Sequence, residues 1–136
     1  MLPRNARRTV SRFLFICLGG AVGTGARYLV GLGMLRWLGP AFPFGTLTVN
    51  VAGSFLLGVT MALGLEYGAI SPDLRVFLAT GVMGGFTTYS SFNYETVGYF
   101  ERGAWLVGGT YVAVTLVTCF LAGVLGVGSV RWLVAR

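Results

Sequence analysis

Four long apolar runs fill most of the chain, and they constrain its fold more than any other feature. They lie at about residues 13–32 (with an apolar tail to 38), 44–65, 74–100 and 104–134. Each has the ~20 residues that an α-helix needs to cross the hydrocarbon core of a bilayer. Only 10% of the residues are charged, against about 25% in soluble domains. The sequence therefore predicts an all-α integral membrane protein with four transmembrane helices per subunit.

Turn signals separate these runs and leave little chain for anything outside the membrane. The connections LGPAFPFG and EYGAISPD contain proline and glycine, and the third connection is the short ERG. The first run is longer than the ~7–15 residues of a signal-peptide core, so we expect it to be retained. The expected organisation is a basic N-terminal tail at 1–12 and one four-helix transmembrane domain at 13–136, in the cell (inner) membrane as a multi-pass protein.

The arginines predict the orientation of these helices. Four spans put both termini on one side, and termini in the cytoplasm place seven arginines inside and two outside, as the positive-inside rule favours. Arginines at the ends of apolar runs are typical of membrane anchors, so no nucleic-acid partner is expected. Arg27, near the far end of the first run, either extends to the interface or attracts anions to a pore mouth.

Polar side chains recur at helical spacing within the second and fourth runs. Thr46 and Asn50 lie one turn apart, as do Tyr111 and Thr115. An amide at membrane depth is costly unless it faces protein or water. Asn50 therefore either bonds to a neighbouring helix or lines a pore as a hydrogen-bond donor, and the spacing favours neither. The same two interpretations apply to the fourth run.

The third run contains the unusual segment GGFTTYSSFNYE, residues 84–95. Glycine has poor helix propensity, and hydroxyl side chains compete for backbone groups. The segment predicts either a glycine-rich packing face in an unbroken helix or a break whose carbonyls need protein, water or an ion. Tyr89 and Phe92 project in similar directions. They either pack, or turn their electropositive ring edges toward an anion.

Three segments in this order, FPFGTLTVNVAGSFLLG, ATGVMGGFTTYSSFNYET and ERG, resemble the CrcB/Fluc fluoride channels. The similarity runs from Gly19 to roughly the fourth run. The resemblance implies a channel, not an enzyme, that passively exports fluoride and relieves fluoride toxicity. It also implies an antiparallel, dual-topology homodimer in which the third helix is broken at mid-membrane.

The resemblance also assigns roles to residues. The anion pathway would comprise Asn50, Tyr89, Ser91, Phe92, Tyr111 and Thr115. Arg27 would lie at the pore mouth and Thr46 at a polar site of the dimer interface. The backbone carbonyls of Gly84 and Thr87 would hold a structural Na⁺ at the dimer centre. Family members usually have phenylalanine where this chain has Tyr89.

Three other interpretations compete with the channel. A small multidrug-type proton-coupled exporter of cationic compounds would need an acid in the first run, and that run has none. A non-transporting assembly subunit would use the glycine faces and polar stripes for packing alone. An intramembrane enzyme lacks histidine and any paired acids. The expected partners are therefore a second copy of the chain, fluoride and the lipid bilayer.

Overall fold

Helices make up all the regular structure in the computed structural model, which describes residues 4–136 and the side chains from residue 8 onward. Residues 1–3 of the expected N-terminal tail lie outside the described residues, and the remainder of the tail is helical. The elements are α1 (Arg4–Leu38), α2 (Phe44–Met61), the π-helical segment η1 (Ala62–Glu66), α3 (Pro72–Val76), the π-helical segment η2 (Phe77–Met83), α4 (Gly84–Phe86), α5 (Tyr89–Glu101) and α6 (Trp105–Val134).

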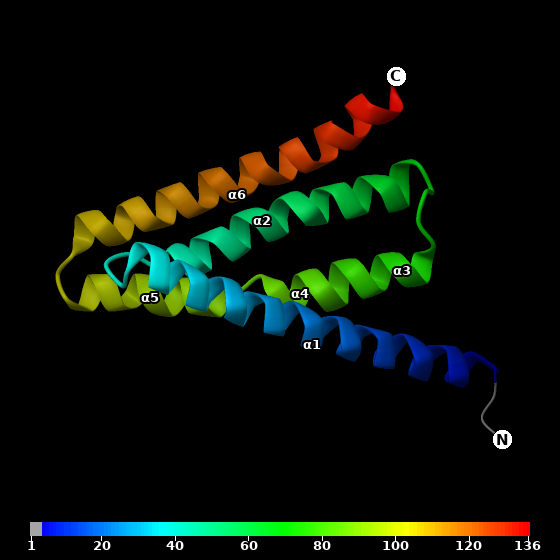
Figure 1. Ribbon diagram of the computed structural model, residues 1–136, viewed down its shortest axis with the longest axis horizontal. Coiled ribbons are helices and arrows are strands. Elements are labelled where there is room, and N and C mark those ends of the chain that lie inside the picture. Colours follow the sequence, from blue (N-terminus) through cyan, green and yellow to red (C-terminus); the bar gives the residue numbers. More distant parts are fainter. Residues whose placement is uncertain (1–3) are drawn as a thin grey trace.

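The chain runs back and forth along the long axis of the molecule (Figure 1). α1 leads away from the N-terminus, α2 returns, α3 to α5 lead away again, and α6 returns, so that both termini lie at one end. Three described stretches are long and apolar enough to cross a membrane: Arg8–Leu38, Phe44–Glu66 and Trp105–Val134. They confirm the first, second and fourth predicted runs, and with them a multi-pass membrane protein.

The third predicted run is divided into pieces. Its start follows local rules, because Ser71 accepts a hydrogen bond from the Leu74 amide at 3.3 Å and Pro72 occupies the first helical turn. Thr87 and Thr88 then have extended backbones, with ψ of 160° and 109°. Gly84–Phe86 remains helical. The break is therefore narrower than the glycine-rich segment suggested.

Glycines allow the helices to approach closely at two contacts. In the first, α1 packs against η2 and α4, where a Cβ on Gly19 would lie 2.8 Å from the Phe77 carbonyl oxygen. In the second, α2 packs against α6, where a Cβ on Gly58 would lie 2.5 Å from the Gly123 carbonyl oxygen. Small residues at such contacts are typical of helix packing in membranes, because no hydrophobic force drives the helices together there.

Replacing Gly126 with alanine is expected to lower the thermal stability of the protein. The new Cβ would clash with the carbonyl oxygen of Phe55 and lie 3.2 Å from the amide nitrogen of Val59. Both are backbone atoms, so α2 and α6 must separate, and overpacking of this kind costs about 1–3 kcal/mol. The matched control is Gly128→Ala on the same helix, where nothing lies within 4 Å of the new Cβ.

Thermal unfolding of the purified variants in detergent measures the difference. The melting temperature should fall for Gly126→Ala and stay near that of the unmodified protein for Gly128→Ala. Equal melting temperatures for the two variants would contradict close backbone packing between α2 and α6.

Candidate functional site

The amide of Asn50 joins α2 to the break in the third segment. Its Nδ2 donates to the Thr88 carbonyl oxygen at 3.1 Å, and its Oδ1 accepts from the Thr88 amide at 2.7 Å. In a continuous helix the Thr88 amide would donate to the Gly84 carbonyl. The side chain of Asn50 therefore replaces the lost helical bond, and the Gly84 carbonyl oxygen is released from it.

Thr88 also begins α5. Its hydroxyl oxygen accepts from the Ser91 amide at 3.2 Å, as an N-cap side chain does. The same hydroxyl donates to the Ser91 Oγ at 3.0 Å. The proton of the Ser91 hydroxyl is then left to serve another acceptor. Thr88 was not among the predicted site residues, although a hydroxyl residue ahead of a helical run is a recognised cap signal.

Arg27 reaches the same break from α1. Its Nη1 donates to the Thr87 carbonyl oxygen at 3.2 Å, and the side chain is half-buried. This contact places the guanidinium beside the last carbonyls of α4, where a positive charge complements unpaired helix carbonyls. Arg27 therefore donates to one of the two carbonyls predicted to bind a cation, that of Thr87, and this arrangement was not anticipated.

The carboxylate of Glu95 lies between two hydroxyl groups from other helices. The Thr46 Oγ1 donates to one oxygen at 2.7 Å, and the Tyr111 hydroxyl donates to the other at 2.7 Å. Glu95 was not among the predicted site residues, although an acid deep within an apolar run is a recognised signal of function. Thr46, which was predicted to lie at the dimer interface, thus has a hydrogen-bond partner within its own subunit. The Tyr111 hydroxyl has a single proton, and the bond to Glu95 uses it.

Aromatic rings surround the buried Tyr111. Its ring centroid lies 5.2 Å from that of Phe92 in an edge-to-face arrangement, and 5.2 Å from that of Phe42. Phe92 in turn lies 5.8 Å from Tyr89. Phe92 is buried, whereas Tyr89 is 75% exposed. The two rings are therefore in contact, as predicted, but the Tyr89 ring is exposed in a single subunit.

Most of the predicted site residues line one cavity of about 360 Å³. The members are Asn50, Gly84, Thr87, Tyr89, Phe92 and Thr115. The Oγ1 of Thr115 is buried and has no hydrogen-bond partner in the part of the chain that the structure describes. Leaving a buried hydroxyl unpaired costs about 1–3 kcal/mol. The Thr115 hydroxyl is therefore available to donate to a group from outside its own subunit.

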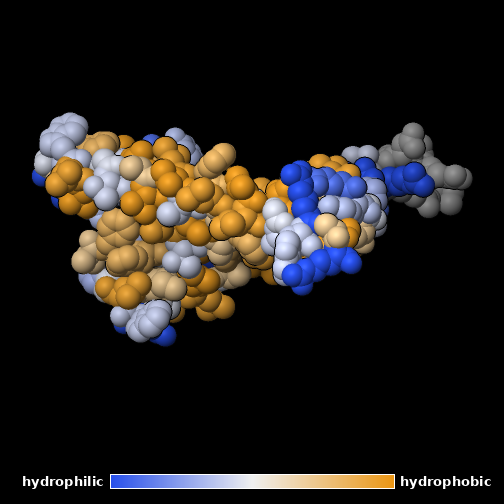
Figure 2. All heavy atoms as spheres, turned by 90° about the horizontal axis from the view of Figure 1, so that it is seen from above, coloured by the Kyte–Doolittle hydropathy of each residue, from blue (hydrophilic) through white to orange (hydrophobic). Residues whose placement is uncertain are grey.

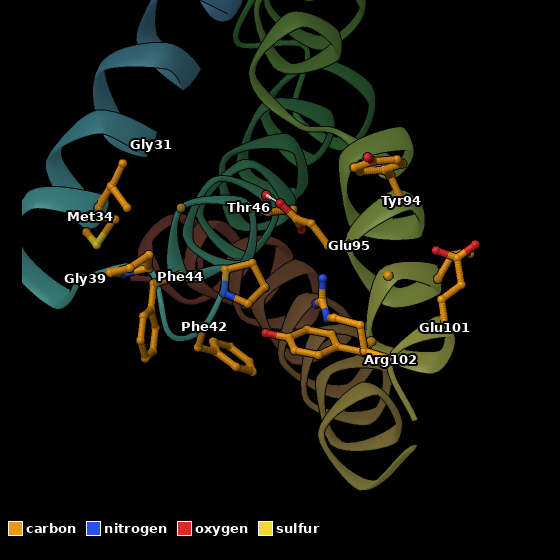
Figure 3. Close-up of a pocket in the computed structure, with 17 residues that line it drawn as sticks. Gly31, Met34, Gly39, Phe42, Phe44, Thr46, Tyr94, Glu95, Glu101 and Arg102 are labelled. Carbon is orange, nitrogen blue, oxygen red and sulfur yellow. Dashed lines mark hydrogen bonds between the residues drawn. The ribbon is translucent and has the colours of Figure 1, made fainter. Parts of the chain in front are cut away.

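A second cavity, of about 580 Å³, opens near the connection between α1 and α2. Thr46 and Glu95, which are hydrogen-bonded to each other, both line this cavity. Arg102 lines it as well, from the end of α5 (Figure 3). Tyr111 and Ser91 line neither cavity. Tyr111 contacts Phe92, which lines the smaller cavity, and Glu95, which lines the larger one. The contacts of Tyr111 therefore link the linings of the two cavities, which together carry hydroxyls, an amide and aromatic rings.

Comparisons with known proteins identify the family. The sequence model of the family described as "CrcB-like protein, Camphor Resistance (CrcB)" matches residues 14–127. The chain is 54% identical to the fluoride-specific ion channel FluC of Anaeromyxobacter sp. over 124 residues, which cover 91% of this chain and 98% of that protein. It is 51% identical to the FluC protein of Sorangium cellulosum, over 93% of this chain and 99% of that protein. The chain therefore belongs to the CrcB family.

Proposed function

We propose that this protein is a fluoride-selective channel that exports fluoride passively and so relieves fluoride toxicity. The observation that carries the proposal is the 54% identity to a fluoride-specific ion channel over nearly the full length of both chains. The site contains hydroxyls, an amide and aromatic rings, which suit the transfer of an anion. The relatives are named as fluoride-specific ion channels, which supports a channel and not an enzyme.

Three side chains are free to donate hydrogen bonds to a passing anion. A narrow path must replace the water molecules that an ion sheds on entering it. Asn50 has a second amide proton, the Ser91 hydroxyl proton has no acceptor in the part of the chain that the structure describes, and the Thr115 hydroxyl has no partner there either. Tyr111 donates to Glu95 instead. We therefore infer that Asn50, Ser91 and Thr115 replace the hydration shell and that Tyr111 orients Glu95.

The ring edges of Phe92 and Tyr89 would fill the gaps between these donors. An aromatic edge carries a partial positive charge, which attracts an anion weakly. Weak attraction suits conduction, because an ion that binds too tightly does not leave. The full positive charge of Arg27 would serve this purpose less well, and it is directed to the Thr87 carbonyl. Chloride is larger than fluoride and fits a narrow path of this kind poorly.

A second copy of the chain would complete the site. Non-helical backbone at membrane depth is tolerated only where protein or water covers it. Gly84 and Tyr89 flank the break, and both are exposed in the single subunit. We infer a homodimer whose subunits cover each other's breaks, with α3 to α5 as a fourth crossing of the membrane. The antiparallel, dual-topology arrangement follows from the family resemblance.

A structural Na⁺ at the dimer centre fits the groups present at the break. Carbonyl oxygens of interrupted helices are typical Na⁺ ligands. The Gly84 carbonyl is released from its helical bond, and the Thr87 carbonyl retains a second lone pair beside the bond from Arg27. The partner would supply further ligands to complete the shell of the ion. When bound, the ion would join the two broken segments electrostatically.

Efflux from liposomes tests the proposed function. Purified protein is reconstituted with internal potassium fluoride or potassium chloride, and a selective electrode records release after the potassium gradient is discharged. We expect fast fluoride release and chloride release near that of protein-free liposomes. Chloride release at a similar rate, or no fluoride release from folded protein, would overturn the channel. Release of a cationic dye driven by a proton gradient would favour the exporter instead.

A further inference from the structure

The end of the molecule that holds both termini is strongly basic. We call it the basic end. It contains seven of the ten arginines and two of the four acids in the chain. The arginines are Arg4, Arg7, Arg8, Arg12, Arg75, Arg131 and Arg136, and the acids are Glu66 and Asp73. Hydrophilic residues gather there beside an otherwise largely hydrophobic surface (Figure 2).

Both acids of the basic end are already paired. Arg12 Nε lies 2.7 Å from Asp73 Oδ1, and Arg131 contacts both carboxylate oxygens of Glu66, at 2.7 and 2.9 Å. These are the ion pairs among the residues whose side chains the structure describes. Arg8 is exposed and belongs to neither pair. The basic end therefore retains positive charge that no acid of the described chain neutralises.

α1 is longer than the hydrocarbon core is thick, so its arginine-bearing first turns lie at the membrane surface. Its 35 residues extend for about 52 Å at 1.5 Å per residue, whereas the hydrocarbon core is about 30 Å thick. The apolar part begins at Phe13, which is 63% exposed and suited to lipid. The preceding turns, which carry Arg8 and Arg12 one turn apart, then lie at the level of the lipid headgroups.

A second helix ends at the same level. Arg136 lies 3.7 Å over the ring of Trp132, and both residues are exposed. Tryptophan and arginine at the end of a membrane helix are typical of the interface. The basic turns of α1 are thus accompanied by a second cationic group, which directly follows the end of α6. The segment before residue 14 lies outside the family match.

We propose that the basic end binds the headgroups of anionic phospholipids. The partner follows from three features: uncompensated arginines, placement at headgroup depth, and an apolar helix that continues directly into the hydrocarbon. Juxtamembrane arginines are each attracted to an anionic lipid surface within about one Debye length. This binding is independent of fluoride conduction and would hold even if the proposed function failed.

Native mass spectrometry of the full chain tests the binding. The purified protein in detergent is mixed with equal amounts of phosphatidylglycerol and phosphatidylcholine that have the same acyl chains. We expect preferential retention of phosphatidylglycerol, and the preference should fall about fivefold for each arginine replaced in Arg7→Gln/Arg8→Gln. The matched control is Arg36→Gln/Arg102→Gln, which removes the same charge at the opposite end and should keep the preference.

Two further measurements identify charge as the cause. Arg7→Lys/Arg8→Lys keeps the charge and should keep the preference, and raising the salt concentration should reduce it. Equal retention of the two lipids by the unmodified protein would overturn the proposal. So would an unchanged preference in the glutamine variant, or a loss of preference in the lysine variant.

Discussion

Asn50→Asp is expected to reduce fluoride efflux by about 100-fold or more. Aspartate keeps the bond from the Thr88 amide but cannot donate to the Thr88 carbonyl, 3.1 Å away. It also places a negative charge in the cavity that fluoride would cross. Two like charges 4 Å apart repel each other by about 4 kcal/mol at an effective dielectric constant near 20, and each 1.4 kcal/mol corresponds to tenfold.

The measurement is the initial rate of fluoride release from liposomes, normalised to the amount of reconstituted protein. Thr60→Val is the control on the same helix, because the Thr60 hydroxyl donates to its own helix, at Leu56, and lines neither cavity. The control should conduct at the unmodified rate. A folded Asn50→Asp variant with efflux within about threefold of the unmodified protein would remove Asn50 from the pathway.

Tyr111→Phe is expected to slow fluoride efflux about tenfold while leaving the fold intact. Phenylalanine keeps the ring contacts to Phe42 and Phe92 but removes the hydroxyl that donates to Glu95 at 2.7 Å. A hydrogen bond to a charged group is worth about 1.5–3 kcal/mol. Without it the Glu95 carboxylate is held by Thr46 alone and is free to turn toward Phe92, where its charge would repel fluoride.

A double variant separates this cause from simple damage to the core. In Tyr111→Phe/Glu95→Gln the side chain that is released carries no charge, so fluoride efflux should recover relative to Tyr111→Phe alone. Efflux and thermal unfolding are measured for both variants. An efflux rate in the double variant no higher than in Tyr111→Phe would mean that the Glu95 charge is not what slows the ion. A full rate in Tyr111→Phe would remove Tyr111 from any role in conduction.

The position of the helix break could be predicted only in part from the local sequence. The glycines and hydroxyls of residues 84–88 predicted a weak point, because these residue types hold a helix poorly. The structure keeps Gly84–Phe86 helical and extends the backbone at Thr87 and Thr88. The exact position depends on Asn50, which binds Thr88 from 38 residues earlier in the chain. That contact is nonlocal, so no local pattern could have located the break more closely.

The hydrogen-bond partners of Glu95 could not be predicted from the sequence. The sequence marked it as an acid deeper than the others, but nothing in its own helix indicates what would satisfy it. Its two donors, Thr46 and Tyr111, come from α2 and α6. Each was predicted to serve a different role, at the dimer interface and in the anion pathway. Only packing of three helices together brings the three side chains to one point.

The sequence by itself determined the class of protein and the inventory of its site. Apolar runs of membrane length form helices, because lipid offers no hydrogen-bond partners to the backbone. The residue types of the motifs indicated the family. The tertiary structure decided which polar groups are engaged and which are free. Thr115 is left without a partner, whereas Tyr111 is committed to Glu95. Hydrogen bonds between helices depend on their relative rotation and distance, which side-chain spacing along one helix does not encode.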